Sequence, residues 1–328
     1  MTDQTGLKLV DRDEQGVDRA FRADVLAGMR EGQKAIPSRW LYDDAGSQLY
    51  EDITQIPEYY PARAETEILK TRGAEFAEAI GPGRAVVEFG SGSSVKTPAL
   101  LSAIDPAAYV PLDIAGDFLR AAASDLSAKF PGLPVFPVEA DFMRRVELPD
   151  EVADMPKLGF FPGGTIGNMV ARTATDLLRT MRETLGEGSM LLVGMDLIKD
   201  TAVLEAAYDD AGGVTAQFNL NLARRINREL DGTIPIDRLR HEARWNDAFA
   251  RVEMHLVATE DIVFEIAGEE FAMVEGETIH TENSHKFDRR SADKQLLAGE
   301  WTPIGRWLDS QQRFSVVLAE ASVPRSAP

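Results

Sequence analysis

Short apolar segments alternate with helix-like segments between residues 85 and 194, and this alternation constrains the fold more than any other feature. The strand-like runs lie at 85–89, 109–112, 134–138, 158–161 and 190–194. Segments with helical spacing separate them around Leu100, at 118–126 and at 176–185. Most of these strands are apolar on both faces, as in a parallel sheet that helices cover on both sides. The pattern predicts an α/β fold.

The rhythm changes after Asp200, which indicates a second structural region. Residues 202–230 have the pattern of long helices, and residues 250–287 have the pattern of β-strands. A last strand covers 314–318. An insertion of different character therefore separates the fifth strand from the end of the α/β domain. The length of 328 residues leaves room for about two domains.

Charge and composition exclude several classes of protein. The chain has 35 Lys and Arg against 54 Asp and Glu, a formal net charge of −19, and its basic clusters are only pairs, so we expect no nucleic acid partner. No apolar run approaches the roughly 20 residues of a membrane span, and the first thirty residues have no apolar signal region. The absence of cysteine excludes disulfides, thiolate metal sites and a cysteine nucleophile. We therefore expect a cytoplasmic protein without a membrane segment.

A glycine loop follows the first strand, in the sequence EFGSGSSVKT at 88–97. A phosphate-binding P-loop needs glycine directly before Lys96-Thr97, where Val95 stands, so this type of loop is excluded. A dinucleotide-binding loop needs a third glycine at the same position, which weakens that alternative without excluding it. Glu88, Gly90 and Gly92 fit the acidic–x–Gly–x–Gly loop that binds S-adenosylmethionine in class I methyltransferases.

Two further carboxylates follow strands of the same predicted sheet. Asp113 ends the second strand, where its two oxygens can accept hydrogen bonds from both hydroxyls of a ribose. Asp141 and Phe142 follow the third strand and suit an adenine, with the exocyclic amine at the carboxylate and the two rings in contact. Either Asp can also be an ordinary helix cap. Three acidic residues at the carboxyl ends of neighbouring strands together favour an adenosyl ligand.

Tyrosines cluster before the α/β region, in LYDDAGSQLYEDITQIPEYYP at 41–61, which holds four of the six in the chain. A buried tyrosine hydroxyl needs a hydrogen-bond partner, so the cluster is compatible with a polar pocket that has aromatic walls. Packing between two helices explains it equally well, and composition alone does not decide between the two.

Taken together, these residues resemble the histidine-specific methyltransferases of ergothioneine biosynthesis, the L-histidine Nα-methyltransferase family. The resemblance extends from about Ser38 to Leu318 and depends on these strings in this order: 41–65, EFGSGSSVKT (88–97), GGTIGN (163–168), DLIKD (196–200), AYDDAGGVTAQFNLN (207–221), RVEM (251–254) and TENSHKF (281–287).

The resemblance implies a monomer with two domains. Residues 62–199 and 287–328 would form a Rossmann-like class I methyltransferase domain that binds S-adenosylmethionine. Residues 1–61 and 200–286 would form an α+β substrate-binding domain. The implied reaction is the threefold methylation of the α-amine of L-histidine to hercynine, without a metal. The four histidines have no spacing typical of metal ligands, which agrees with this expectation.

The resemblance also assigns roles to individual residues. It implies that the cofactor contacts the glycine loop and the strand ends, at Glu88, Gly90, Gly92, Lys96, Asp113, Asp141 and Phe142. The catalytic candidates beside the substrate amine are Tyr42 and Thr165, with Gly163 as a further contact. Asn168 and Tyr208 would hold the carboxylate of histidine. The imidazole would contact Tyr59, Glu282 and Ser284, between the apolar walls Phe218 and Met254.

The chain departs from the family pattern at two positions near these residues. His285 stands where Cys is frequent, and Pro162 stands where Leu is usual. An alternative is therefore a methyltransferase of the same fold acting on another aromatic amino acid, such as tryptophan. A catalytically silent binding protein is disfavoured, because it would have no reason to keep Gly90, Gly92 and Asp113.

Overall fold

The computed structural model describes residues 16–92, 96–114 and 116–322, so Ser93, Ser94 and Val95 of the glycine loop lie outside the described residues. The chain divides into two compact units. Unit 1 consists of residues 1–60 and 199–285, and unit 2 of residues 61–198 and 286–328. The domain boundaries expected from the sequence differ from these by one residue at each junction.

Unit 2 is built on one seven-stranded sheet in the order β11-β12-β5-β4-β1-β2-β3. Five parallel strands make up most of it: β1 (Ala85–Phe89), β2 (Ala108–Asp113), β3 (Val138–Glu139), β4 (Lys157–Phe161) and β5 (Met190–Asp196). An antiparallel pair, β11 (Trp301–Leu308) and β12 (Phe314–Ala321), extends the sheet beyond β5. The strand order changes direction between β1 and β4. The α/β fold class predicted from the sequence is confirmed.

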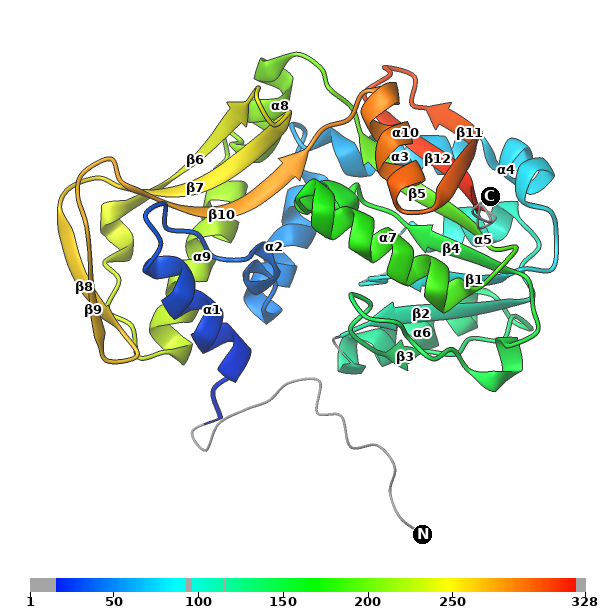
Figure 1. Cartoon of the computed structure of the whole chain (residues 1–328), viewed down its shortest axis with the longest axis horizontal. Helices are drawn as coiled ribbons and strands as arrows, with labels where there is room; N and C mark the ends of the chain where they lie inside the picture. The colour runs from blue at the N-terminus through cyan, green and yellow to red at the C-terminus, as the bar shows by residue number, and fades with distance from the viewer. Residues whose placement is uncertain (1–15, 93–95, 115, 323–328) are drawn as a thin grey trace, which may run out of the picture. The chain divides into compact units, whose positions relative to one another are not determined.

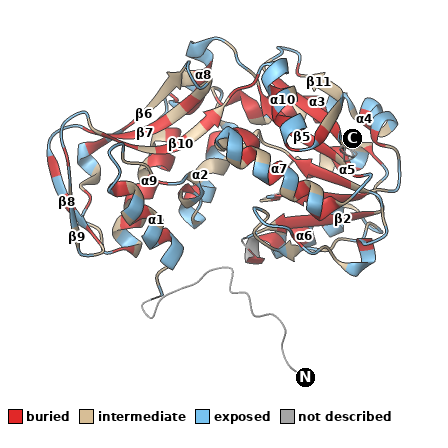
Figure 2. Ribbon diagram, viewed as in Figure 1, coloured by how far each residue is buried: buried red, intermediate tan, exposed pale blue. Residues whose placement is uncertain are grey.

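Helices cover both faces of this sheet. They are α3 (Tyr60–Thr71), α4 (Gly73–Ile80), α5 (Thr97–Ala103), α6 (Gly116–Lys129), α7 (Ala171–Leu185) and α10 (Arg289–Ala298). Figure 1 shows α7 and α10 in front of the sheet, where Leu177, Met181 and Leu296 join one hydrophobic core with alternate residues of the strands. The buried residues of α7 recur at helical spacing, which explains why this segment forms an amphipathic helix. Figure 2 shows the central strands buried along their length.

Two strand predictions in unit 2 need correction. The expected strand at 134–138 is reduced to a bridge between Tyr109 and Val135 and the short β3, because Pro134 and Pro137 lack the N–H that a ladder needs. Strand β11 was not predicted, and its Pro303 and Gly305 flank an irregularity in its pairing with β12. The sheet is consequently mixed rather than parallel throughout.

Unit 1 has an α+β architecture, as the sequence resemblance implied. Its sheet has the order β10-β7-β6 and is antiparallel, with β6 at Leu239–Asn246, β7 at Arg251–Ala258 and β10 at Thr278–His285. A separate hairpin consists of β8 (Ile262–Ile266) and β9 (Glu269–Met273). The helices are α1 (Arg19–Met29), α2 (Asp44–Gln55), α8 (Thr201–Tyr208) and α9 (Val214–Glu229). Short 3₁₀ turns complete both units at Ser38–Leu41, Asp150–Val152, Thr165–Asn168 and Ile236–Arg238.

Helices α8 and α9 pack against β6 and β7, so one face of this sheet is covered. Side chains alternate between the two faces along each strand, so this face carries His241, Met254 and Leu256, whereas Glu253 and His255 lie on the opposite face. No helix in the part of the chain that the structure describes is long and apolar enough to cross a membrane.

Candidate functional site

The predicted cofactor-binding residues of unit 2 follow the carboxyl ends of its parallel strands. Gly90 follows β1, Asp113 ends β2, Asp141 follows β3 and Gly163 lies two residues after β4. Open α/β sheets bind ligands outside these strand ends, at the point where the strand order changes direction. That point lies between β1 and β4, so the fold brings the predicted residues to the expected edge of the sheet.

The glycine loop has a backbone that side chains would disturb. Gly90 and Gly92 have φ values of +74° and +48°, in the left-handed region that favours glycine. A Cβ on Gly90 would lie 3.2 Å from the ring of Phe142, so only glycine leaves this space open. The N–H of Gly92 donates to Oδ2 of Asp113 at 2.9 Å, which fixes the loop against the end of β2. Because Gly90 and Gly92 carry no side chain and Asp113 supplies carboxylate acceptors, these residues fit an adenosyl ligand.

Asp141 and Phe142 follow β3, where Asp141 makes a hydrogen bond to the backbone and Phe142 packs against other aromatic rings. Oδ1 of Asp141 accepts the N–H of Met143 at 3.0 Å, so this carboxylate also stabilises the turn that follows it. The ring of Phe142 lies edge-on to Phe89 and to Phe161, with centroid distances of 6.3 and 6.2 Å. The aromatic ring is thus fixed beside the glycine loop.

Glu88 lies inside unit 2, on the sheet face opposite the core under α7. Its side chain is 2% exposed, and Oε2 accepts the hydroxyls of Tyr109 and Thr97 at 2.5 and 2.7 Å. Burial raises the pKa of Glu88 to about 7, although the two hydroxyls oppose this shift. These two hydrogen bonds of Glu88 connect β1 to β2 and α5.

Glu65 is a residue that the sequence analysis missed. It belongs to α3, is completely buried, and accepts the N–H of Gly163 at 2.8 and 3.0 Å and the ammonium of Lys96 at 2.5 Å. A Cβ on Gly194 would lie only 2.2 Å from its Oε1, so β5 needs glycine there. One carboxylate thus joins the glycine loop to the segment after β4. The sequence signal that could have identified Glu65 was its position in the segment 41–65, on which the family resemblance depends.

The other predicted residues of unit 2 belong to the segment after β4. Gly163 and Gly164 have φ values of +86° and +69°, which begins the 3₁₀ turn Thr165–Asn168. The hydroxyl of Thr165 donates to the carbonyl of Pro162 at 3.0 Å. The left-handed glycines explain the double glycine of the GGTIGN string.

In unit 1, the predicted aromatic residues form one cluster. Tyr42 lies edge-on to Phe218 and to Tyr50, with centroid distances of 5.4 and 5.6 Å. Tyr59 lies between Tyr50 and Tyr208, at 6.4 and 6.0 Å. Burial, followed by the neighbouring Tyr50, raises the pKa of Tyr59 well above its ordinary value, so this phenol keeps its proton. Tyr50 is a member of the cluster that the sequence analysis did not assign to the site.

Glu282 and Ser284 of β10 lie at this aromatic cluster. Glu282 is 7% exposed, and its Oε1 lies 3.4 Å from the hydroxyl of Tyr42. The hydroxyls of Ser284 and Tyr208 are 2.7 Å apart. Met254 is paired with Glu282 across the strands and is buried. The structure therefore groups the residues expected at the imidazole, together with Tyr42 and Tyr208, within one unit.

A buried histidine that the sequence analysis did not assign supports Tyr208. Nε2 of His241 lies 2.7 Å from the carbonyl of Tyr208, and its Nδ1 lies 2.9 Å from Nδ2 of Asn219. A carbonyl only accepts, so Nε2 carries the proton and Nδ1 accepts from the amide. Burial lowers the pKa of His241, which favours this neutral form. The arrangement fixes the last residue of α8 on the sheet.

His285, one of the two departures from the family pattern, lies on the other face of β10. It is paired with Arg251, whereas Ser284 is paired with Val252, and successive residues of a strand alternate between faces. Nδ1 of His285 lies 3.2 Å from the carbonyl of Phe249. Its ring is thus directed away from the face that carries Glu282 and Ser284.

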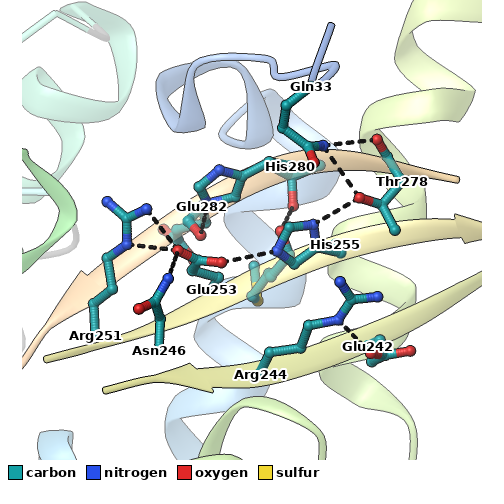
Figure 3. A network of polar contacts seen from close by, with 12 residues as sticks. Gln33, Glu242, Arg244, Asn246, Arg251, Glu253, His255, Thr278, His280 and Glu282 are labelled. Carbon is teal, nitrogen blue, oxygen red and sulfur yellow. Dashed lines mark hydrogen bonds and ion pairs between the residues drawn. The ribbon is translucent and has the colours of Figure 1, made fainter. Parts of the chain in front are cut away.

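Among the described residues, Glu253, His255 and His280 are close enough to be considered for a metal, with potential ligand atoms within 4.8 Å of one another (Figure 3). The two imidazoles are stacked, with centroids 4.8 Å and planes 16° apart, so their in-plane lone pairs do not converge on one ion. Oε1 of Glu253 already accepts Nε and Nη2 of Arg251 at 2.7 and 2.6 Å. This geometry favours a hydrogen-bonded network over a metal centre.

Comparison with known proteins gives the context for these two groups of residues. The family model of the histidine-specific, SAM-dependent methyltransferases matches residues 21–321. Histidine N-alpha-methyltransferase of Mycolicibacterium smegmatis is 37% identical over 310 residues, which cover 92% of this chain and 94% of that protein. Ergothioneine biosynthesis protein 1 of Neurospora crassa is 28% identical over 91% of this chain and 36% of its own length.

Solved structures include a similar chain at much lower identity. The CcbJ methyltransferase of Streptomyces caelestis aligns with a TM-score of 0.48 and 15% identity, over 86% of this chain and 100% of that one.

Proposed function

The chain belongs to the histidine-specific, SAM-dependent methyltransferase family, and from this premise we propose that it methylates the α-amine of L-histidine. We further propose that three methyl groups are added, giving hercynine as the first step of ergothioneine biosynthesis. Similarity to the ergothioneine protein of Neurospora crassa supports this place in a pathway.

The observation that carries the choice of histidine is the buried carboxylate of Glu282, two residues before Ser284 on the same face of β10, where the hydroxyl of Ser284 lies 2.7 Å from that of Tyr208. A neutral imidazole has one N–H that donates and one nitrogen that accepts. A carboxylate and a hydroxyl therefore match its two nitrogens. A substrate without this N–H would leave Glu282 unpaired in a buried place, at a cost of about 1–3 kcal/mol. The indole of tryptophan has an N–H but no acceptor nitrogen, so it matches the carboxylate and leaves the hydroxyl without an acceptor. The pair of groups therefore favours histidine over both apolar amino acids and tryptophan.

The remaining residues of unit 1 would surround the imidazole. Phe218 and Met254, both buried, supply apolar walls, and Tyr59 keeps its phenolic proton as a donor. Tyr208, which the family resemblance assigns to the carboxylate of histidine, is held by His241 through its backbone carbonyl, so its hydroxyl has a fixed position beside Ser284 at the imidazole end. Rigid placement of this kind reduces the entropy lost when the substrate binds.

In unit 2 we propose that the predicted residues bind the cofactor and the amino-acid end of the substrate. When bound, S-adenosylmethionine supplies an electrophilic methyl group on a sulfonium. Gly90, Gly92 and Asp113 would hold its ribose, Phe142 and Asp141 its adenine, and Lys96 its carboxylate. Gly163, Thr165 and Asn168 would contact the amine and carboxylate of histidine, with Tyr42 as the second candidate at the amine. Orientation of a neutral amine toward the methyl carbon accounts for much of the rate in such a displacement.

The decisive experiment is an assay of the purified protein with S-adenosylmethionine and each of the twenty amino acids. Mass spectrometry should show mass gains of one, two and three methyl groups on histidine. Preferential methylation of tryptophan would favour the alternative substrate, and no methylation of any amino acid would favour a silent binding protein. Sedimentation of the same sample tests the monomer that the family resemblance implies.

A further inference from the structure

Strand β10 contains an irregularity directly before Glu282. His280 is paired with His255 of β7, but Glu282 is paired with the adjacent residue Met254. Thr281 is therefore an extra residue on β10, which makes this a β-bulge. Bulges change the direction in which the following side chains point, and they occur frequently next to active sites.

The bulge decides which face of the sheet Glu282 occupies. In a regular strand, residues 280 and 282 would point to the same face. The extra residue instead places Glu282 and Ser284 on the face of Met254, with the aromatic cluster, while His280 stays on the face of His255. A shift of one residue exchanges the two faces of a strand. Without the bulge, the carboxylate proposed to bind imidazole would point away from the other pocket residues.

Two side chains hold the bulge in place. The hydroxyl of Thr281 donates to the carbonyl of Met254 at 3.0 Å. Nε2 of His280 lies 3.0 Å from the carbonyl of Glu282, and it must be the donor because a carbonyl only accepts. The backbone of His280 is itself fixed on its other side, since its N–H and carbonyl bond to Lys34 and Ile36 at 2.8 and 2.9 Å.

A network behind His280 fixes the orientation of its ring (Figure 3). His255 stacks on it, Nδ1 of His255 lies 3.2 Å from the hydroxyl of Thr278, and Nε2 lies 3.2 Å from Glu253. Glu253 is held in turn by Arg251 and by Asn246, whose Nδ2 is 2.9 Å from Oε1. These contacts leave the ring of His280 little freedom, so its N–H stays directed at the carbonyl of Glu282.

We propose that His280 and Thr281 are positioning residues that set substrate selectivity, because together they hold the bulge that directs the Glu282 carboxylate toward the imidazole of the substrate. This inference rests on the proposed function, since imidazole is the group that Glu282 would bind. Neither side chain contacts the substrate, and both act through the backbone of β10.

The main test compares His280→Leu with His280→Gln. Leucine fills a similar volume without a donor, whereas the amide of glutamine restores an N–H at a similar reach. The leucine variant should raise the KM for histidine about 10-fold, with a smaller change in kcat, and the glutamine variant should recover most of the loss. Affinity for S-adenosylhomocysteine, measured by calorimetry, should be unchanged. Thr281→Val provides an independent disturbance of the same bulge if His280→Leu does not fold.

A double-mutant cycle tests whether His280 acts through Glu282. In a protein that already carries Glu282→Gln, His280→Leu should raise the KM for histidine little further, because the carboxylate that His280 positions is already altered. Fully additive losses would overturn the inference, as would equal losses for histidine and for tryptophan. Glu242→Gln is the matched control, since it removes a carboxylate that pairs with Arg240 and Arg244 on the same face of the sheet.

The two hypotheses fail in different ways. An unmodified protein that does not methylate histidine would refute the proposed function and this inference together. An active unmodified protein whose His280→Leu and Thr281→Val variants keep full selectivity for histidine would refute the inference alone.

Discussion

Glu65 and Lys96 form an ion pair between a fully buried carboxylate and a half-buried ammonium, with Oε2 2.5 Å from Nζ. The same carboxylate accepts the N–H of Gly163, so a helix before the sheet joins two segments that follow β1 and β4. Both segments carry residues that we propose to contact cofactor or substrate. Loss of this carboxylate should therefore affect binding as well as folding.

Replacement of Glu65 by methionine should lower the free energy of unfolding by about 3–5 kcal/mol, because it removes a fully buried carboxylate that bonds to both Lys96 and the N–H of Gly163. The double variant Glu65→Met/Lys96→Met should be more stable than Glu65→Met alone, while cofactor affinity stays reduced. Urea unfolding and calorimetry with S-adenosylhomocysteine measure the two quantities. A double variant less stable than the single variant would contradict the ion-pair explanation.

Asp113→Ala should weaken cofactor binding by about 1–3 kcal/mol, since it removes charge-assisted hydrogen bonds and releases the N–H of Gly92. Asp113→Asn should weaken cofactor binding less, because the amide oxygen of asparagine can still accept the N–H of Gly92. Calorimetry with S-adenosylhomocysteine checks both. Asp125→Asn, an equal change of charge at an exposed position of α6, is the control and should bind normally.

Asn168→Ala should raise the KM for histidine and leave cofactor affinity nearly unchanged, if its amide binds the carboxylate of the substrate. Steady-state kinetics and calorimetry separate the two effects. Equal losses of both affinities would place Asn168 at the cofactor instead.

Glu282→Ala should lower kcat/KM for histidine by about 10- to 100-fold, because it removes a charge-assisted hydrogen bond to the imidazole. Tryptophan should be affected much less, since the space vacated by the side chain and the loss of its charge favour the larger indole, so the preference for histidine should shrink. Competition assays with both amino acids measure the ratio, with Glu270→Gln at an exposed position of β9 as control. A parallel fall for both substrates would indicate a folding defect.

Stability should depend on pH through Glu88. Its pKa rises from 4.5 to about 7 on folding, so the native state binds more protons between these values, and the free energy of unfolding falls as the pH rises through this window. The loss is complete above about pH 7 and amounts to at most about 3 kcal/mol. Glu88→Gln should therefore gain stability relative to the unmodified protein between about pH 5 and about pH 8. Denaturant unfolding of both proteins at about pH 5 and at about pH 8 checks this. A difference in the free energy of unfolding between the two proteins that stays constant with pH would contradict the raised pKa of Glu88.

The α/β class could be predicted from the sequence because its signals are local. Apolar strands alternating with amphipathic helices, and a Gly90–Gly92 pair directly after a strand, depend on neighbours a few residues apart. Strands β6 and β11 were missed because their local signals are poor: β6 is largely polar, and β11 contains Pro303 and Gly305.

The sequence by itself determined the alternation of strands and helices between residues 85 and 194 and the placement of Gly90, Asp113 and Asp141 at strand ends, since backbone periodicity and turn chemistry are local properties. Only the tertiary structure decided that Glu65 of α3 meets Lys96 and Gly163, and that the Thr281 bulge turns Glu282 toward the aromatic cluster. Both depend on pairing between segments far apart in the chain. A strand register shifted by one residue changes the face of every following side chain without any change in sequence pattern.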